Sequence, residues 1–189
     1  MTSSEMTGIK LEGAAEDFWN WSIDVYEREG VKAPLLLLQD RYGYNVNNVL
    51  WTMWSALRGY SLSNDDVHDI LESVADMQAH TVRQLREIRR FLTVPKAGFR
   101  TEELHGLRRR VLMVELEGEK LVQSRLAGFT ADRSGTSENG NVAETARRYF
   151  GVCADRLENP IILADDLGDE APQRLFDMIW DIASMEKNA

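Results

Sequence analysis

Two short acidic motifs are the first candidates for chemistry, because both follow the pattern DDxxD. On a helix the first and last aspartates of this pattern face the same way, which suits a magnesium ion shared with a diphosphate group. Each motif also has a plainer explanation. The first follows Ser63 and Asn64 at an expected helix start, and the second contains Gly168 and precedes Pro172, which interrupt helices. The six aspartates are Asp65, Asp66, Asp69, Asp165, Asp166 and Asp169.

Polar side chains also interrupt the most apolar part of the chain, LLLLQDRYGYNVNNVLWTMW at residues 35–54. Asn47 and Trp51 are one helical turn apart and therefore share a helix face. A buried indole N–H needs an acceptor, and a polar network inside an aromatic cluster is costly unless its groups are paired. We expect such a network either to fix the fold or to receive a ligand. The candidate residues are Trp19, Gln39, Asp40, Asn47 and Trp51.

Charged side chains on two expected long helices form a further candidate site. Arg86 and Arg90 lie along one side of the first helix, and Glu115 and Glu119 lie along one side of the second. One explanation is ion pairing between the helices, where an exposed pair contributes about 0–1 kcal/mol. The other is a site for an anion or a partner protein, because a guanidinium group matches the geometry of carboxylate and phosphate.

Familiar catalytic and cofactor-binding motifs are missing from the sequence. It contains no HExxH, GxSxG or GxGxxG pattern and no phosphate-binding loop. The histidines are dispersed, and Cys153 is the only cysteine, which we expect to be a small buried residue in a reducing compartment. We therefore expect no cofactor and no metal ion, and we favour a protein that is not an enzyme.

The positions of the apolar residues predict an all-α fold with a single domain. Strand patterns are nearly absent, and the four prolines lie where helices would start or stop. Gly30 and Gly43 are expected to end helices, Pro34 to lie in a first turn, and Asn45 to cap the next helix. We expect residues 1–13 to be disordered and residues 130–141 to form a mobile loop. The predicted helices cover residues 14–29, 31–43, 45–60, 64–94, 104–121 and 142–158, with a last helix from Pro172.

The two longest helices are predicted to pack against each other as an antiparallel hairpin. Each has apolar residues at alternating spacings of three and four, and the connection between them is short. The expected seam of the first helix is Val67, Ile70, Val74, Met77, Thr81, Leu85, Ile88 and Leu92. The expected seam of the second is Leu104, Leu107, Val111, Val114, Gly118 and Leu121.

Composition and charge narrow the class of protein. The chain has 189 residues and a net charge of -9, and its longest apolar run is far shorter than the roughly 20 residues of a membrane helix. Residues 83–110 carry nine basic and three acidic side chains, a balance of +6, so the rest of the chain carries -15. We expect a cytoplasmic protein without a secretory signal, without membrane insertion and without nucleic acid as a partner.

The segment DFWNWSIDVYEREGVKAPLLLLQDRYGYNVNNVLWTMW resembles the opening pattern FWxFSxxxY, GV, LxLQDxxGxDVNxxLFxxW of a small proteobacterial helical family. That family is known only as domain of unknown function family 2390. The stretches VRQLREIRRFL and VELEGEKL are similar to its LRxxRRxLK and ELxAExL blocks, so the likeness spans residues 17–126. The resemblance implies a cytoplasmic bacterial protein and no particular chemistry.

The family pattern can be placed residue by residue on this chain. Asn45 stands where the family usually has Asp, and Gly118 stands where it usually has Ala. Because Asn and Asp cap a helix about equally well, the first departure favours a capping role. The matching positions are Phe18, Trp19, Ser22, Tyr26, Gly30, Val31, Leu36, Leu38, Gln39, Asp40, Gly43, Val46, Asn47, Trp54, Leu85, Arg86, Arg89, Arg90, Glu115, Leu116 and Glu119.

Two hypotheses for function follow. The first is a binding or assembly protein that acts through contacts with another protein or with itself as a homodimer. The second is a helical protein or enzyme that binds a small molecule or anion in a polar and aromatic pocket, and its lower-ranked version binds magnesium diphosphate through the DDxxD motifs. The expected binding residues for either hypothesis are Trp19, Gln39, Asp40, Asn47, Trp51, Arg86, Arg90, Glu115 and Glu119.

Overall fold

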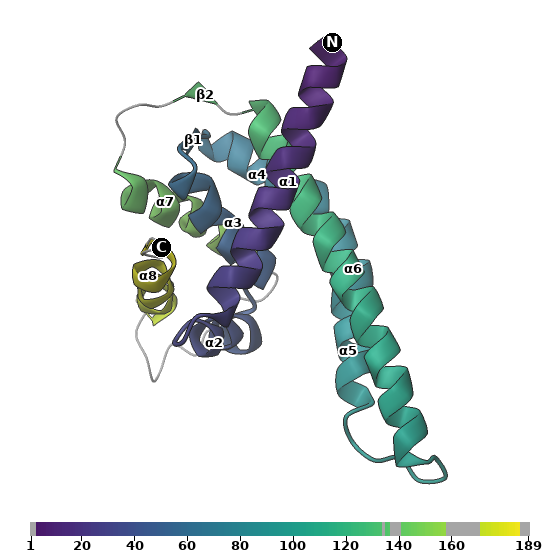
Figure 1. The fold of residues 1–189 in the computed structure, drawn as a ribbon. Helices are drawn as coiled ribbons and strands as arrows, with labels where there is room; N and C mark the ends of the chain where they lie inside the picture. The colour runs from purple at the N-terminus through teal and green to yellow at the C-terminus, as the bar shows by residue number, and fades with distance from the viewer. Residues whose placement is uncertain (1–2, 134, 137–140, 158–170, 186–189) are drawn as a thin grey trace.

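The computed structural model describes residues 3–133, 135–136, 141–157 and 171–185, and these residues form an all-α fold, as predicted (Figure 1). The only strands in these ranges are two short ones that pair antiparallel, with Tyr60 opposite Thr136. No helix in the described ranges is both long and apolar enough to cross a membrane. The elements are α1 (Ser3–Glu27), α2 (Lys32–Tyr42), α3 (Val46–Leu57), β1 (Tyr60–Ser61), α4 (Asn64–Met77), the π-helical turn η1 (Gln78–Val82), α5 (Arg83–Phe91), α6 (Thr101–Arg133), β2 (Gly135–Thr136), α7 (Val142–Ala154) and α8 (Ala171–Ala183).

The predicted helix ends between α2 and α4 are confirmed. Gly43 ends α2 with φ 76°, in the left-handed region that glycine tolerates. The Asn45 side chain accepts hydrogen bonds from the backbone N–H groups of Asn47 and Asn48 at the start of α3. Ser63 caps α4 in the same way, and the carboxylate of Asp66 accepts the Ser63 backbone N–H in return. These ends need only local hydrogen bonds, which is why the sequence identifies them.

Helix α1 begins earlier and ends slightly earlier than predicted. It starts at Ser3 instead of residue 14, because an interior glycine such as Gly13 costs only about 1 kcal/mol and does not stop a helix. The expectation of disorder for residues 1–13 remains a prediction. The expected loop at 130–141 begins later than predicted, because residues 130–133 are the last residues of α6. Residues 137–140 of that loop lie outside the described residues, so its mobility also remains a prediction.

The π-helical turn η1 changes which face of the long helix is buried. The predicted seam holds from Val67 to Val74, but the next fully buried residue is Val82, not Thr81. A π turn holds one more residue than an α turn, so every later side chain is rotated by about 100°. The predicted seam is therefore wrong between Met77 and Leu92: Ile88 is 48% exposed, and the face that continues from Val82 carries Arg86 and Arg89 instead. Leu92 itself is buried, as predicted.

The predicted seam of α6 is also partly wrong. Leu104 and Gly118 are buried, whereas Leu107, Val114 and Leu121 are 42%, 49% and 62% exposed. Polar residues occupy much of the buried face in their place. Gly118 allows close contact with η1, since a Cβ atom there would lie 3.2 Å from Cγ2 of Val82. The buried residues of α6 are Leu104, Glu115, Gly118, Val122, Gln123, Leu126, Ala127, Thr130 and Ala131.

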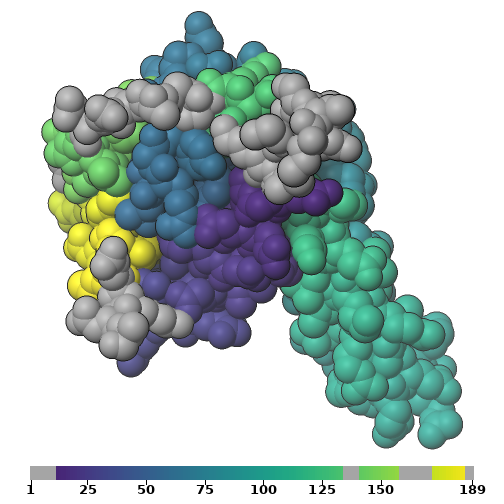
Figure 2. Space-filling view, turned by 45° about the horizontal axis from the view of Figure 1, so that its top comes forward, coloured from purple at the N-terminus to yellow at the C-terminus, as the bar shows by residue number. Residues whose placement is uncertain are grey.

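The molecule has a body and a projecting arm. Helix α3 lies at the centre of the body, where it contacts α1, α2, α6, α7 and α8. The hairpin of α5 and the first half of α6 extends away from this body, as Figures 1 and 2 show. We call residues 83–121 the arm. Its base is the segment where α6 meets α1 and α5 meets α2, and its tip is the link between α5 and α6.

Candidate functional site

The structure separates the predicted polar network around the tryptophans into independent pieces. The indole of Trp51 donates to Oγ1 of Thr130 at 2.8 Å, and the indole of Trp54 donates to Asp17 at 2.7 Å. Neither tryptophan uses Gln39, Asp40 or Asn47 as its acceptor, so that part of the expectation is wrong. The acceptors come from α6 and α1, far from the tryptophans in sequence, and no local pattern identifies them.

Asn47 belongs to a small closed network in the core. Nε2 of Gln123 donates to Oδ1 of Asn47 at 2.8 Å, and Oγ of Ser22 donates to Oε1 of Gln123 at 3.0 Å. Ser22 also lies 2.9 Å from the backbone oxygen of Trp19. Asn47, Gln123 and Ser22 are only 3–5% exposed. This network joins α1, α3 and α6 through hydrogen bonds between buried side chains, so we interpret it as structural.

Arg86 is the centre of a second network that joins three helices at the base of the arm. Its Nη1 donates to Gln39 of α2 at 2.7 Å. Its Nε and Nη2 donate to Glu115 and Glu119 of α6 at 3.0 and 2.6 Å. The sequence predicted ion pairing between these helices as one explanation of the charges, and the contacts agree. The π turn makes them possible, because it rotates Arg86 onto the face that meets α6.

Two further ion pairs extend this second network. Arg89 binds Glu115 through Nε and Nη2 at 2.5 and 3.1 Å, so this buried carboxylate is shared by two guanidinium groups. Nearer the solvent, Nη2 of Arg90 donates to Asp40 at 2.7 Å, and Gln39 donates to the same oxygen at 3.0 Å. Both Arg90 and Asp40 are about half exposed, at 54% and 51% of their side chains. The outer pair is therefore far weaker than the inner one.

The pKa values of the two α6 glutamates in this network, Glu115 and Glu119, are shifted in opposite directions. Burial opposes ionisation of Glu115, but the hydrogen bonds and charges of Arg89 and Arg86 prevail and lower its pKa from the ordinary 4.5. For Glu119 burial is the larger effect and outweighs the attraction of Arg86, so its pKa is raised. Asp40 resembles Glu115: burial opposes its charge, and the hydrogen bonds of Arg90 and Gln39 still lower its pKa.

A cleft of about 630 Å³ lies beside the second network. One wall is formed by α4, η1 and α5, and the other by the end of α2 and the start of α3, with the end of α7 at one side. Gln39, Asp40, Arg86 and Arg90 line this cleft, whereas Trp19, Asn47, Trp51, Glu115 and Glu119 do not. Of the nine residues expected to bind a ligand or partner, four thus share one cavity.

Several residues of these networks were not among the predicted site residues. Arg89 was identified only through the family pattern, and Gln123 and Thr130 were not singled out. A signal does exist for Gln123, because Glu115, Glu119 and Gln123 repeat at intervals of four and form one polar stripe on α6. Thr130 carries no such signal, because its role depends on the distant Trp51.

The first acidic motif and the cysteine show no sign of catalytic use. Asp66 is engaged in the cap of α4, and Asp69 accepts a hydrogen bond from Arg133 at 3.0 Å. The second motif, at residues 165–169, lies outside the described residues. Burial raises the pKa of the Cys153 thiol to about 12, so it is inert as a nucleophile near neutral pH. Within the described ranges no group of three or more potential metal ligands occurs.

Comparison with known proteins identifies a family without assigning an activity. No curated protein and no solved structure matches the chain. One family model, described as protein of unknown function (DUF2390), matches residues 17–126. This range holds every residue of both networks, and it ends before Thr130, α7 and α8. Because the match covers more than half of the 189 residues, the chain belongs to this family of unknown function.

Proposed function

We propose that this chain is a bacterial cytoplasmic assembly protein that acts through protein–protein contacts of its arm. The observation that carries the proposal is an apolar strip on the arm that no other described element covers. Among the residues whose exposure the structure describes, fourteen large hydrophobic side chains are exposed, and nine of them lie between residues 88 and 121. They are Ile88, Phe91, Val94, Phe99, Leu107, Met113, Val114, Leu116 and Leu121.

The strip lies on the side of the arm that faces away from α2. The side near α2 is the one that carries Arg90 and Glu119. Arg90 binds Asp40 of α2, and Glu119 binds Arg86, which also contacts α2. At 100° per residue, Ile88 lies about 160° from Arg90 around α5, and Val114 about 140° from Glu119 around α6. Ile88 of α5 and Leu107, Val114 and Leu121 of α6 therefore share the opposite side and form the strip. Leu116 lies only about 60° from Glu119 around α6 and is not part of it. A two-helix hairpin with one open apolar side is half of a four-helix bundle.

The partner that this surface fits best is a second copy of the chain. On α6, Leu107, Val114 and Leu121 repeat every seven residues, and Arg110 and Glu117 alternate with them on the same face. Neither Arg110 nor Glu117 has an ion-pair partner among the residues of the structure described above. They lie on opposite sides of Val114 along the helix. Two antiparallel copies of α6 related by a two-fold axis near Val114 bring Arg110 of each close to Glu117 of the other.

This charge pattern also selects the antiparallel arrangement. In a parallel pair Arg110 would face Arg110 and Glu117 would face Glu117, and like charges on an interface are unfavourable. The antiparallel pair replaces both repulsions with two attractions. A contact with a different protein would not require this pattern. A two-fold symmetric contact does require it, because each charge on one copy must meet the opposite charge on the other, as Arg110 and Glu117 do about Val114.

A charge-exchange experiment tests the proposal. We expect the unmodified chain to be a dimer in sedimentation equilibrium at micromolar concentration. Arg110→Glu and Glu117→Arg should each weaken the dimer by about tenfold or more, because each single reversal creates two repulsive contacts. The double variant Arg110→Glu with Glu117→Arg should recover most of the affinity, since the opposite charges face each other again.

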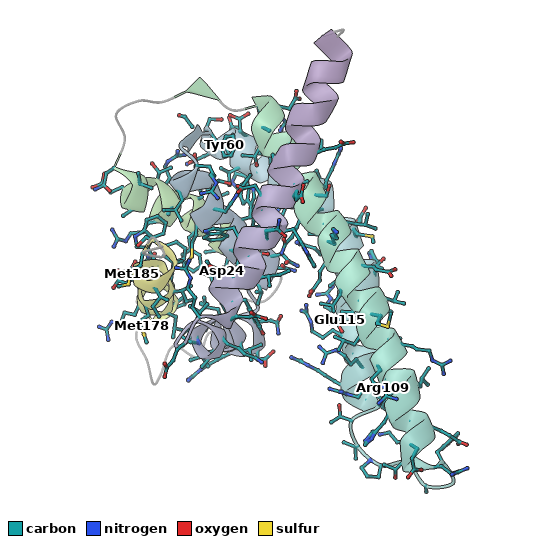
Figure 3. All side chains as sticks on the ribbon, in the orientation of Figure 1. Asp24, Tyr60, Arg109, Glu115, Met178 and Met185 are labelled. Atoms are coloured by element: carbon teal, nitrogen blue, oxygen red, sulfur yellow. The ribbon has the colours of Figure 1, made fainter. Side chains whose placement is uncertain are left out.

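Arg109 supplies the matched control. It precedes Arg110, is exposed on the same arm and lies toward the tip (Figure 3), but it is rotated off the strip by about 100°. Arg109→Glu makes the same charge change and should leave the dimer intact. A chain that stays monomeric at all concentrations, or a double variant no better than the single ones, would refute self-association through this face.

A further inference from the structure

We propose that the cleft between α2, α3, η1 and α5 binds a small organic anion, with a carboxylate or phosphate head and an apolar body. This site is separate from the uncovered strip, which lies on the other side of the arm, and it does not depend on self-association. At about 630 Å³ the cleft has the size of typical small-molecule sites, which range over roughly 300–1,000 Å³.

The rim of the cleft holds more hydrogen-bond donors than the protein uses. A guanidinium group has five N–H bonds. Arg86 directs three of its nitrogen atoms to Gln39, Glu115 and Glu119, which leaves one N–H on each terminal nitrogen. In the described part of the chain, Arg90 donates only to Asp40. A surplus of donors on a wall fits a ligand with several acceptor oxygens.

Two side-chain amides on the opposite wall add to this surplus. Asn45 and Asn48 both line the cleft. Their oxygen atoms are engaged, in the cap of α3 and by Nε2 of Gln78 at 2.6 Å. Their NH₂ groups donate to no acceptor that the described residues provide. Donor-bearing side chains from both walls thus line the same cleft, where an oxyanion could accept from several of them.

The inner network prepares Arg86 for such a ligand. Glu115 and Glu119 hold its guanidinium from the α6 side, so little side-chain entropy is lost when an anion binds from the cleft side. The outer pair of Arg90 and Asp40 is half exposed and contributes little, so an incoming carboxylate can take the place of Asp40 at small cost.

The floor of the cleft determines the rest of the ligand. Ala75, Ala79 and Leu157 are half-buried and present apolar surface to the cleft. The other apolar lining residues, Leu71, Val82, Tyr44 and Cys153, are at most 5% exposed. An apolar chain or ring would cover this floor, whereas an inorganic anion would leave it in contact with water. Guanidinium groups outnumber carboxylates in the lining by four to three, so charge alone attracts an anion only weakly. We therefore expect both the anionic head and the apolar body of the ligand to contribute to its affinity.

The π turn is an independent indication that this cleft is used. Gln78, Ala79 and Val82 of η1 all line it. An inserted π turn is less stable than continuous α-helix, and such turns occur frequently at functional sites. Here the turn has a specific effect: it aims Arg86 between the cleft and α6.

The test uses the full chain, labelled with ¹⁵N, and four probes: octanoate, octyl phosphate, 1-octanol and inorganic phosphate. We expect octanoate or octyl phosphate to bind and to shift the side-chain amide signals of Asn45 and Asn48. 1-Octanol should bind about tenfold more weakly, and inorganic phosphate should not bind measurably. The stronger of the two anionic probes identifies the preferred head group.

Three variants locate the site. Arg90→Gln should weaken the anionic probe about tenfold without changing the affinity for 1-octanol, and Ala75→Phe should weaken both probes by filling the floor. Arg109→Gln, an equal loss of charge on the distant part of the arm, should change neither. Circular dichroism confirms that each variant is folded. The proposal is overturned if neither anionic probe binds, if 1-octanol binds as tightly as the anions, or if Arg90→Gln and Ala75→Phe bind like the unmodified chain.

Discussion

Arg86 of α5 and Glu119 of α6 are joined by a hydrogen bond of 2.6 Å at the base of the arm. The same guanidinium binds Glu115 one helical turn away and Gln39 of α2. An apolar seam would let the two helices slide against each other, whereas this set of directed bonds is satisfied in only one register. The network therefore fixes the direction in which the arm leaves the body.

Replacement of Glu115 by alanine should destabilise the fold. Glu115 is 2% exposed and is the shared partner of Arg86 and Arg89, so its loss leaves two guanidinium groups facing each other. We expect the free energy of unfolding in urea to fall by about 2 kcal/mol, less than the roughly 3–5 kcal/mol of a fully buried pair because both arginines keep some contact with water. Glu87→Ala, at an exposed position of α5 and outside the proposed dimer contact, should change it by less than about 0.5 kcal/mol.

The two neighbouring carboxylates should give opposite pH dependences. The pKa of Glu115 is lowered in the folded state, so its stabilisation is present above its ordinary pKa of 4.5 and is lost as the pH falls through the lower folded value. The pKa of Glu119 is raised, so the folded state holds its proton longer and loses stability as the pH rises above 4.5.

Urea unfolding from pH 3 to pH 7 separates these effects. The unmodified chain should be more stable than Glu115→Gln near pH 7, and this difference in the free energy of unfolding should shrink as the pH falls. Relative to Glu119→Gln, it should lose stability as the pH rises through the raised pKa. Parallel curves for the unmodified chain and Glu119→Gln would show that burial does not control this carboxyl.

Local signals and long-range pairings differ in how well the sequence predicted them. Gly43, Asn45 and Ser63 act on backbone groups within a few residues, so their types and positions identified the helix ends. The buried face between Met77 and Leu92 could not be found by periodicity, because an α-helical repeat does not contain the five-residue step of a π turn.

The pairings inside the core were equally hidden. Asn47 and Gln123 are 76 positions apart. The sequence contains many other polar residues that could pair with either of them equally well, so it does not reveal which pair forms. By contrast, the pairing of Arg86 with Glu115 and Glu119 was accessible, because the predicted hairpin already placed opposite charges on facing helices. Sequence thus suggested the network at the arm, whereas in the core it singled out Asn47 without its partner Gln123.

Gly30 should resist substitution for two separate reasons. Its φ is 88°, in the left-handed region, and a Cβ atom there would lie 2.9 Å from Cδ1 of Ile182 on α8. We expect Gly30→Ala to lower the free energy of unfolding by about 1–2 kcal/mol through the backbone strain alone. Gly106→Ala is the matched control, since it lies within α6 with no atom within 4 Å, and it should stabilise the protein by about 0.5–1 kcal/mol. Equal effects of the two changes would contradict the turn geometry.

The closed core network should behave as a coupled pair. Gln123→Leu removes the donor of Asn47, whose buried oxygen then has no hydrogen-bond partner, and such an orphaned group costs about 1–3 kcal/mol. Asn47→Leu leaves the NH₂ group of Gln123 unpaired in the same way. The double variant removes both polar partners, so its loss should be smaller than the sum of the single losses by about 1 kcal/mol or more. Chemical unfolding followed by tryptophan fluorescence supplies all four free energies. If the losses were additive, the two side chains would not depend on each other, and Asn47 would again be a candidate for binding a ligand.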